Sequence, residues 1–155
     1  MTDPTPNAVL PDLALPATDG THVNLADLRG RKLVLYFYPR DNTPGCTTET
    51  RDFGALHADF AAAGCAVFGI SRDSLKSHEN FKTRLGLPFE LLSDTDEAAC
   101  ESFGVIKLKK MYGKQVRGIE RSTFVFAADG KLARAWRGVK VPGHAAEVLA
   151  FVRTL

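Results

Sequence analysis

The stretch "KLVLYFYPRDNTPGC", residues 32–46, decides the fold. Its first part, 32–39, is almost wholly apolar or aromatic and does not alternate, which is typical of a strand buried on both faces. A loop follows, and then a helical pattern begins. Gly64 is the stop signal of this helical pattern. Before it, apolar residues recur at helical spacing at Phe53, Leu56, Phe60 and Ala63. A buried strand that leads through a loop into a helix predicts the first unit of an α/β sheet.

The rest of the chain extends this pattern. Strand-like and helix-like runs alternate at residues 65–71, 74–86, 89–94 and 96–104. Such alternation predicts parallel strands with right-handed crossovers. The run 122–138 then holds two strand-like segments around Asp129-Gly130, a hairpin signal, and an amphipathic helix closes the chain. We expect an α/β, thioredoxin-like fold with a mixed sheet flanked by helices, built as one domain over 1–155. The first sixteen residues carry four prolines and are expected to run extended over the surface.

The composition excludes several classes of protein. A net charge of +2 and a charged fraction of 25% are too mild to indicate a nucleic-acid partner. The nearest approach to a basic run, Lys107, Lys109 and Lys110, is interpreted as a solvated loop. No apolar run approaches the roughly 20 residues of a membrane helix, and the N-terminus lacks the pattern of a signal peptide. These features predict a cytoplasmic protein that contacts neither membranes nor nucleic acid.

Cys46 is the candidate nucleophile. The carboxyl ends of parallel strands share one edge of the sheet, where sites form in open α/β folds. Cys46 follows the first buried strand and opens a helix at that edge. The unpaired N–H groups and the dipole of a helix N-terminus favour a thiolate over a thiol. Cys46 also shares a helical face with Phe53 and should be partly sheltered. The alternative is that Cys46 is a small buried hydrophobe.

The chain has three cysteines, so at least one thiol lies outside any intramolecular disulfide. Cys65 opens the second strand at the far end of the first helix, roughly 25–30 Å from Cys46 at 1.5 Å per residue. A disulfide needs Cα atoms within about 7 Å, so Cys65 is predicted to be a core residue. Cys100 follows the third strand and lies at the same edge as Cys46. Its apolar neighbours favour a packed core thiol, although a role as partner of Cys46 stays open.

Arg121 is the candidate cation. An antiparallel strand that begins near residue 122 starts at the edge where the parallel strands end, which places Arg121 there. An arginine stays protonated, and its fork of donors suits an anionic sulfur or a polar oxygen. The alternative is a surface arginine that flanks a strand.

Metal and cofactor sites are not indicated. The histidines are scattered, with no i, i+4 pair on one helix and no close cysteine pair, and no glycine-rich phosphate loop follows a strand. Solvent-facing or capping roles are expected for all four, namely His22, His57, His78 and His144.

The loop and helix start carry a family resemblance. Pro39, Thr43 and Cys46 stand as P-x-x-x-T-x-x-C, which resembles the active-site pattern of peroxiredoxins. The fuller string "DNTPGCT" resembles the peroxiredoxin Q branch, also called bacterioferritin comigratory protein. Four further segments resemble that branch in order along nearly the whole chain: "GISRDSLKSHENF", "LLSDTDEA", "YGKQVRGIERSTFVF" and "GHAAEVL". The resemblance implies a thioredoxin-like fold with an N-terminal extension.

The resemblance also implies an antioxidant reaction that reduces hydrogen peroxide and organic hydroperoxides without a cofactor. Cys46 would attack one peroxide oxygen and become a sulfenic acid. Arg121 matches the arginine of the family's active site. Thr43 would hydrogen-bond to the sulfur or the peroxide, and Pro39 would shield the sulfur from water.

The chain lacks the second, resolving cysteine that members of this branch carry. Many of them carry a resolving cysteine five residues after the first, where this chain has Arg51, and others place it in the stretch aligned with "HENFKTRLG" (78–86), which has none. A one-cysteine monomer recycled by thioredoxin, or by glutathione with glutaredoxin, is the expectation. One alternative is a thiol–disulfide oxidoreductase, but the C-x-x-C motif of such enzymes needs a cysteine where this chain has Thr43. A second alternative is a redox sensor that acts through Cys46.

Overall fold

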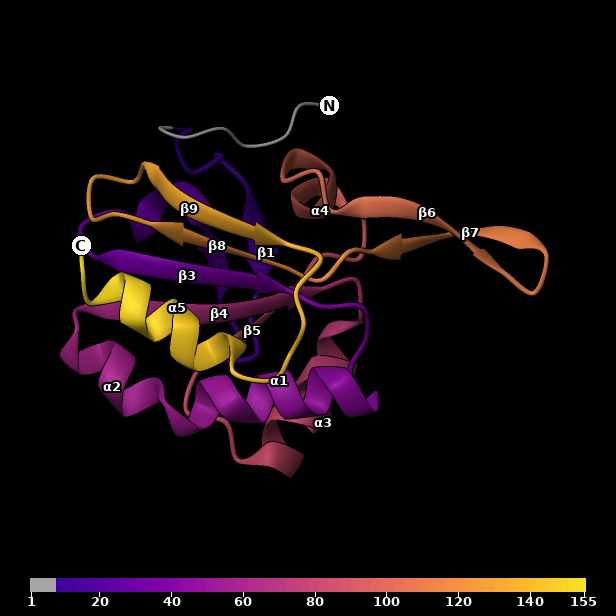
Figure 1. Cartoon of the computed structure of the whole chain (residues 1–155), viewed down its shortest axis with the longest axis horizontal. Helices are drawn as coiled ribbons and strands as arrows, with labels where there is room; N and C mark the ends of the chain where they lie inside the picture. Colours follow the sequence, from indigo (N-terminus) through magenta and orange to yellow (C-terminus); the bar gives the residue numbers. More distant parts are fainter. Residues whose placement is uncertain (1–7) are drawn as a thin grey trace.

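The computed structural model describes residues 8–155, apart from the side chains of residues 109 and 111. At its centre is a five-stranded sheet in the order β5-β4-β3-β8-β9 (Figure 1). The strands are β3 (Lys32–Phe37), β4 (Cys65–Ser71), β5 (Leu91–Ser93), β8 (Ser122–Phe126) and β9 (Leu132–Arg137). Among them, β3, β4 and β5 are parallel, whereas β8 runs antiparallel to β3, and β9 to β8. This is the mixed, thioredoxin-like sheet that the alternating pattern predicts.

Helices cover both faces of the sheet (Figure 1). They are α1 (Pro44–Ala55), α2 (His57–Ala62), α3 (Leu75–Leu85), α4 (Ala98–Ser102) and α5 (His144–Val152). Because side chains alternate along a strand, β3 divides the core in two. Val34 and Tyr36 face the apolar layer of α1, α2, α3 and α5. Leu33 and Leu35 face a second layer, which contains α4 and the N-terminal segment.

The N-terminal segment differs from the expectation of a chain extended over the surface. Within its described part, Ala14–Pro16 (β1) pairs antiparallel with His22–Asn24 (β2), and a short 3-10 helix, η1 (Leu25–Leu28), follows. Leu10 and Leu15 are buried in the second apolar layer. These two leucines lie between prolines of the segment and anchor it to the core, because burying their apolar side chains is favourable. Residues 1–7 lie outside the described residues.

The helix predicted after Cys46 is interrupted once. It ends at Ala55, and α2 starts at His57, with Leu56 in a non-helical conformation between them. Gly54 lies two residues before the break and weakens the helix there, because glycine loses the most backbone entropy when it becomes helical. Phe53 and Phe60 are fully buried on either side of the break.

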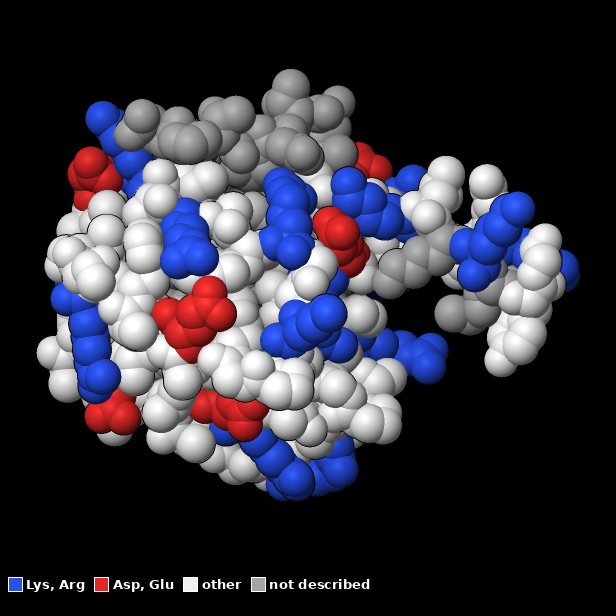
Figure 2. All heavy atoms as spheres, viewed as in Figure 1, with Lys and Arg blue, Asp and Glu red and all other residues white. Residues whose placement is uncertain are grey.

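The segment interpreted as a solvated loop is a β-hairpin. Ile106–Met111 (β6) pairs with Lys114–Ile119 (β7) through a turn in which Tyr112 and Gly113 both have positive φ, 53° and 77°, as a two-residue hairpin turn requires. The ribbon projects away from the body of the molecule (Figures 1 and 2). Lys107 and Lys110 are exposed as expected, but they lie on a strand. Among the described residues, no helix is long and apolar enough to cross a membrane.

Candidate active site

Cys46 lies at the carboxyl edge of the parallel strands, as predicted. It is the third residue of α1 and only 1% exposed, and it packs in the same apolar layer as Tyr36 and Phe53. The shelter is more complete than the partial burial predicted from the helical face. A thiol in this place meets the N–H groups of the first helical turn on one side and apolar side chains on the other.

The start of α1 is fixed by local geometry. Thr43 is the N-cap residue with an extended backbone, and Pro44 occupies the first helical position, which suits its fixed φ. Asn42 has a positive φ of 64° and turns the loop sharply. The Thr43 hydroxyl donates to the Arg40 carbonyl at 2.8 Å, and no contact of this hydroxyl with the sulfur occurs among the described interactions. Pro39 is half-buried at the beginning of the same loop.

Arg121 lies beside the sulfur, where the topology places it. It stands between β7 and β8, and its Nη2 donates to Cys46 Sγ at 3.5 Å. Its Nη1 donates to Glu49 Oε1 at 2.7 Å. Burial disfavours the charge of the guanidinium, but the neighbouring Glu49 and Cys46 raise the pKa of Arg121 above its usual value. The structure therefore shows a permanent cation held between one thiol and one carboxyl group.

Gly45 makes room for this cation. A Cβ atom built on Gly45 would lie 3.2 Å from Arg121 Nη2. That separation is tighter than ordinary van der Waals contact, so a side chain at residue 45 would push the guanidinium away from the sulfur.

Glu49 is a site residue that the sequence reasoning missed. It is 1% exposed, its Oε1 accepts from Arg121, and its Oε2 has no hydrogen-bond partner among the described residues. Burial raises the pKa of Glu49 to about 7, although Arg121 opposes the rise. Spacing could have revealed it, since residues three apart share a helical face and Glu49 follows Cys46 by three.

The other two thiols are buried away from this site. Cys65 is 4% exposed at the start of β4, the end of the sheet opposite Cys46, and burial raises the pKa of its thiol to about 12. Cys100 is fully buried in the layer on the other face of the sheet, where burial and the nearby Asp94 raise its pKa. All three cysteines are free thiols. Cys100 therefore does not share the surroundings of Cys46, although both follow a parallel strand.

The expectation of solvent-facing or capping histidines is wrong for two of the four. His144 is 4% exposed and shares a hydrogen bond with Thr123 Oγ1 at 2.8 Å, and burial lowers its pKa. His78 is fully buried. Because buried histidines need polar partners, their positions depend on contacts with residues distant in sequence.

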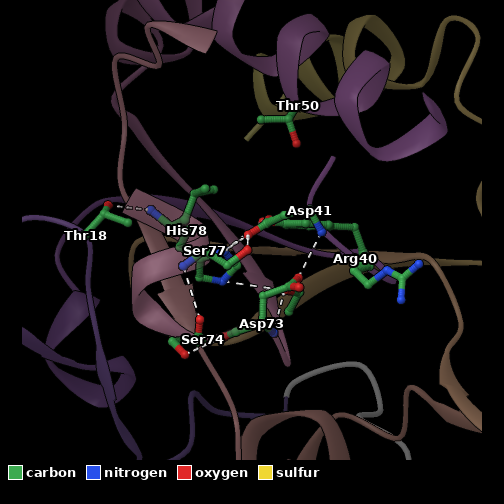
Figure 3. A network of polar contacts seen from close by, with 12 residues as sticks. Thr18, Arg40, Asp41, Thr50, Asp73, Ser74, Ser77 and His78 are labelled. Atoms are coloured by element: carbon green, nitrogen blue, oxygen red, sulfur yellow. Dashed lines mark hydrogen bonds and ion pairs between the residues drawn. The ribbon is translucent and has the colours of Figure 1, made fainter. Parts of the chain in front are cut away.

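His78, Asp41 and Asp73 form the group of described residues with the spacing of a metal site. Most of their polar atoms take part in hydrogen bonds within the protein (Figure 3). Asp41 accepts hydrogen bonds from the hydroxyls of Tyr38 at 2.6 Å and Ser77 at 2.8 Å. Asp73 accepts from the Asp41 backbone N–H at 2.9 Å and from the Ser71 hydroxyl. Donors within the protein thus occupy both oxygens of Asp41 and one oxygen of Asp73, so a cation would compete with these hydrogen bonds.

Known proteins resemble this chain over most of its length. The AhpC/TSA family matches residues 6–135. Peroxiredoxin Bcp of Xanthomonas campestris is 55% identical over 142 residues, 92% of this chain and 89% of its own length. Peroxiredoxin Bcp of Bacillus subtilis is 47% identical over 94% of this chain and 92% of its own.

Solved structures agree in fold as well. The bacterioferritin comigratory protein of Xanthomonas campestris superposes with a TM-score of 0.90 at 52% identity, covering 96% of this chain and 98% of its own. A peroxiredoxin Q variant of Xylella fastidiosa gives a TM-score of 0.93 at 42% identity, covering 99% of this chain and 98% of its own. Because the family match and these relatives cover nearly the whole chain, the chain belongs to the AhpC/TSA family of peroxiredoxins, in the Bcp or peroxiredoxin Q branch.

Proposed function

We propose that Cys46 is the peroxidatic nucleophile of this thiol-dependent peroxidase, with Arg121, Thr43 and Pro39 completing the site. The observation that carries the assignment is the 3.5 Å contact between Arg121 Nη2 and Cys46 Sγ at the first turn of α1. A fixed cation and a helix N-terminus together stabilise a thiolate and the charge that develops on a departing oxygen.

The reaction balances without a cofactor. The Cys46 thiolate attacks one peroxide oxygen, so that an S–O bond forms as the O–O bond breaks. The electron pair of the broken bond leaves on the other oxygen, which takes a proton and departs as water or an alcohol. The bacterioferritin comigratory protein of Xanthomonas campestris has alkyl peroxide reduction activity. We extend that substrate class to this chain, together with hydrogen peroxide, in a role in antioxidant defence and redox homeostasis.

We further propose a one-cysteine cycle. Arg51, at the position where many relatives carry the second cysteine, is exposed, and α3 has no cysteine. Cys65 and Cys100 are buried elsewhere. An external thiol would attack the sulfenic acid, releasing water and forming a mixed disulfide, and a second thiol would free Cys46. Thioredoxin, or glutathione with glutaredoxin, fits this role for a monomer in the cytoplasm.

Mass spectrometry after one equivalent of peroxide tests both proposals. We expect one added oxygen on Cys46 in the absence of thiols, and a mixed disulfide at Cys46 when glutathione is present. Cys46→Ser should abolish peroxide consumption, whereas Cys65→Ser, the matched control, should leave it intact. Peroxide turnover by the Cys46 variant would reject the nucleophile, and a Cys46–Cys100 disulfide would reject the one-cysteine cycle.

A further inference from the structure

His78 links helix α3 to the loop that precedes the nucleophile. Its ring is fully buried. Its Nδ1 lies 2.8 Å from Asp41 Oδ2, and its Nε2 lies 2.9 Å from the backbone carbonyl oxygen of Leu92 (Figure 3). The two nitrogens of one ring therefore join the loop before α1 to strand β5.

Both contacts require the ring to donate. A backbone carbonyl only accepts, so Nε2 carries a proton. The carboxylate of Asp41 already accepts from Tyr38 through Oδ1 and from Ser77 through Oδ2, which is the pattern of an anion. Nδ1 therefore donates to Asp41 as well, and the ring is a double donor in a dry interior. The other carboxylate of this network, Asp73, accepts from the Asp41 backbone N–H and the Ser71 hydroxyl.

Asp41, the partner of His78, lies in the loop between β3 and α1, directly before the helix that carries Cys46. Asp41 is fixed through its side chain by His78 and through its backbone N–H by Asp73. The next residue, Asn42, makes the left-handed turn. Thr43 then occupies the N-cap position of α1, and its hydroxyl donates to the carbonyl of Arg40. The start of α1, and with it the sulfur, is thus set by a chain of short contacts that begins on α3.

We propose that His78 is a positioning residue for the peroxidase reaction. As a double donor it holds Asp41, and through Asp41 it keeps the N-terminus of α1 where Cys46 Sγ meets Arg121. His78 touches none of the reacting atoms. Its effect on the rate comes from geometry, since a displacement of about 1 Å at a reacting centre can lower a rate by up to about 100-fold.

Two substitutions at residue 78 separate this role from mere packing. In His78→Asn the amide nitrogen takes the place of Nδ1 and keeps the bond to Asp41. In His78→Gln it takes the place of Nε2 and keeps the bond to Leu92 instead. Each variant keeps one of the two bonds, but only the Gln variant releases the loop.

We expect single-turnover peroxide consumption by reduced His78→Gln to be about tenfold slower than by the wild type, with His78→Asn losing much less. Each rate is measured well below the unfolding midpoint of that variant, so that lowered stability does not imitate lost positioning. The same two substitutions at His57, which is half-buried in α2 against Phe89, are the control and should leave the rate unchanged.

Equal losses in the two variants, no loss in either, or a greater loss in the Asn variant would overturn the proposal. If either variant fails to fold, Asp41→Asn replaces the pair. We then expect faster amide exchange at residues 40–46, and unchanged protection there would reject the role. The inference rests on Cys46 as the nucleophile. An absence of sulfenic acid on Cys46 in the wild-type protein would reject that assignment, whereas the Asn and Gln comparison tests His78 alone.

Discussion

The buried carboxyl group of Glu49 should make the protein less stable as the pH rises through neutrality. Its side chain is 1% exposed, and one of its oxygens has no hydrogen-bond partner among the described residues. Burial raises its pKa from 4.5 to about 7 in spite of the contact with Arg121. The folded protein therefore binds the proton of Glu49 more tightly than the unfolded chain does.

The size of the effect follows from linkage. Between the two pKa values the folded state holds more protons than the unfolded state, so the free energy of unfolding falls with rising pH. The contribution is fully present below the unfolded value of 4.5 and is lost as the pH passes the folded value of about 7. At 1.36 kcal/mol per pKa unit, about 2–3 kcal/mol of unfolding free energy should disappear between pH 5 and pH 8.

Glu49→Gln isolates this contribution, because a glutamine keeps an oxygen for Arg121 and does not titrate. Urea unfolding of the reduced wild-type and variant proteins at pH 5 and pH 8 measures it. The variant should gain about 2–3 kcal/mol relative to the wild type at the higher pH, whereas groups common to both proteins cancel. Parallel pH profiles would show that Glu49 is already ionised in the folded protein, and the reasoning from burial would fail.

Three further changes test the site. Gly45→Ala places a Cβ 3.2 Å from Arg121 Nη2, so peroxide consumption should fall several-fold with little change in unfolding temperature; an unchanged rate would mean that the guanidinium shifts freely. Thr43→Val removes the hydroxyl that bonds the Arg40 carbonyl and should lower the unfolding free energy by about 1 kcal/mol, as measured in urea. Thr43→Ser is its control, and equal losses in the two variants would contradict the role of this bond. Cys100→Ser alters a thiol buried on the far face of the sheet and should leave steady-state turnover with an added thiol unchanged; a loss of turnover would implicate Cys100 in the cycle.

Local pattern predicts the inner strands β4, β3 and β8 because they are largely buried on both faces of the sheet. β3 and β4 are dense apolar runs, and the stop at Gly86 ends α3 with a positive φ of 62°. Topology then predicts the position of Arg121, since β8 starts where β3 ends, with Ser122 opposite Phe37. The hairpin β6–β7 has no such signal, because its described side chains are mostly exposed and lysines interrupt the apolar residues.

The polar parts of the site depend on contacts that spacing alone does not encode. His78 looks like a surface residue of an amphipathic helix, and its partner Asp41 lies 37 residues away. Glu49 looks like an ordinary helix-surface glutamate until α1 is packed against Arg121. In both cases the sequence supplies a polar residue, and only the packing of two distant segments makes it buried and paired.

The alternation of β3 explains why sharing an edge does not bring two thiols together. Cys46 follows β3 and Cys100 follows β5, and both strands end at the same edge of the sheet. This shared edge alone would allow Cys100 to be a partner of Cys46. Yet Cys46 packs on the face of Tyr36, and Cys100 packs on the face of Phe37. Successive side chains point to opposite faces, so the sheet itself stands between the two sulfurs. A disulfide between them would require α1 or α4 to leave the core. Since burial also raises the pKa of Cys100, its thiol is a poor nucleophile, which supports a reductant from outside the chain.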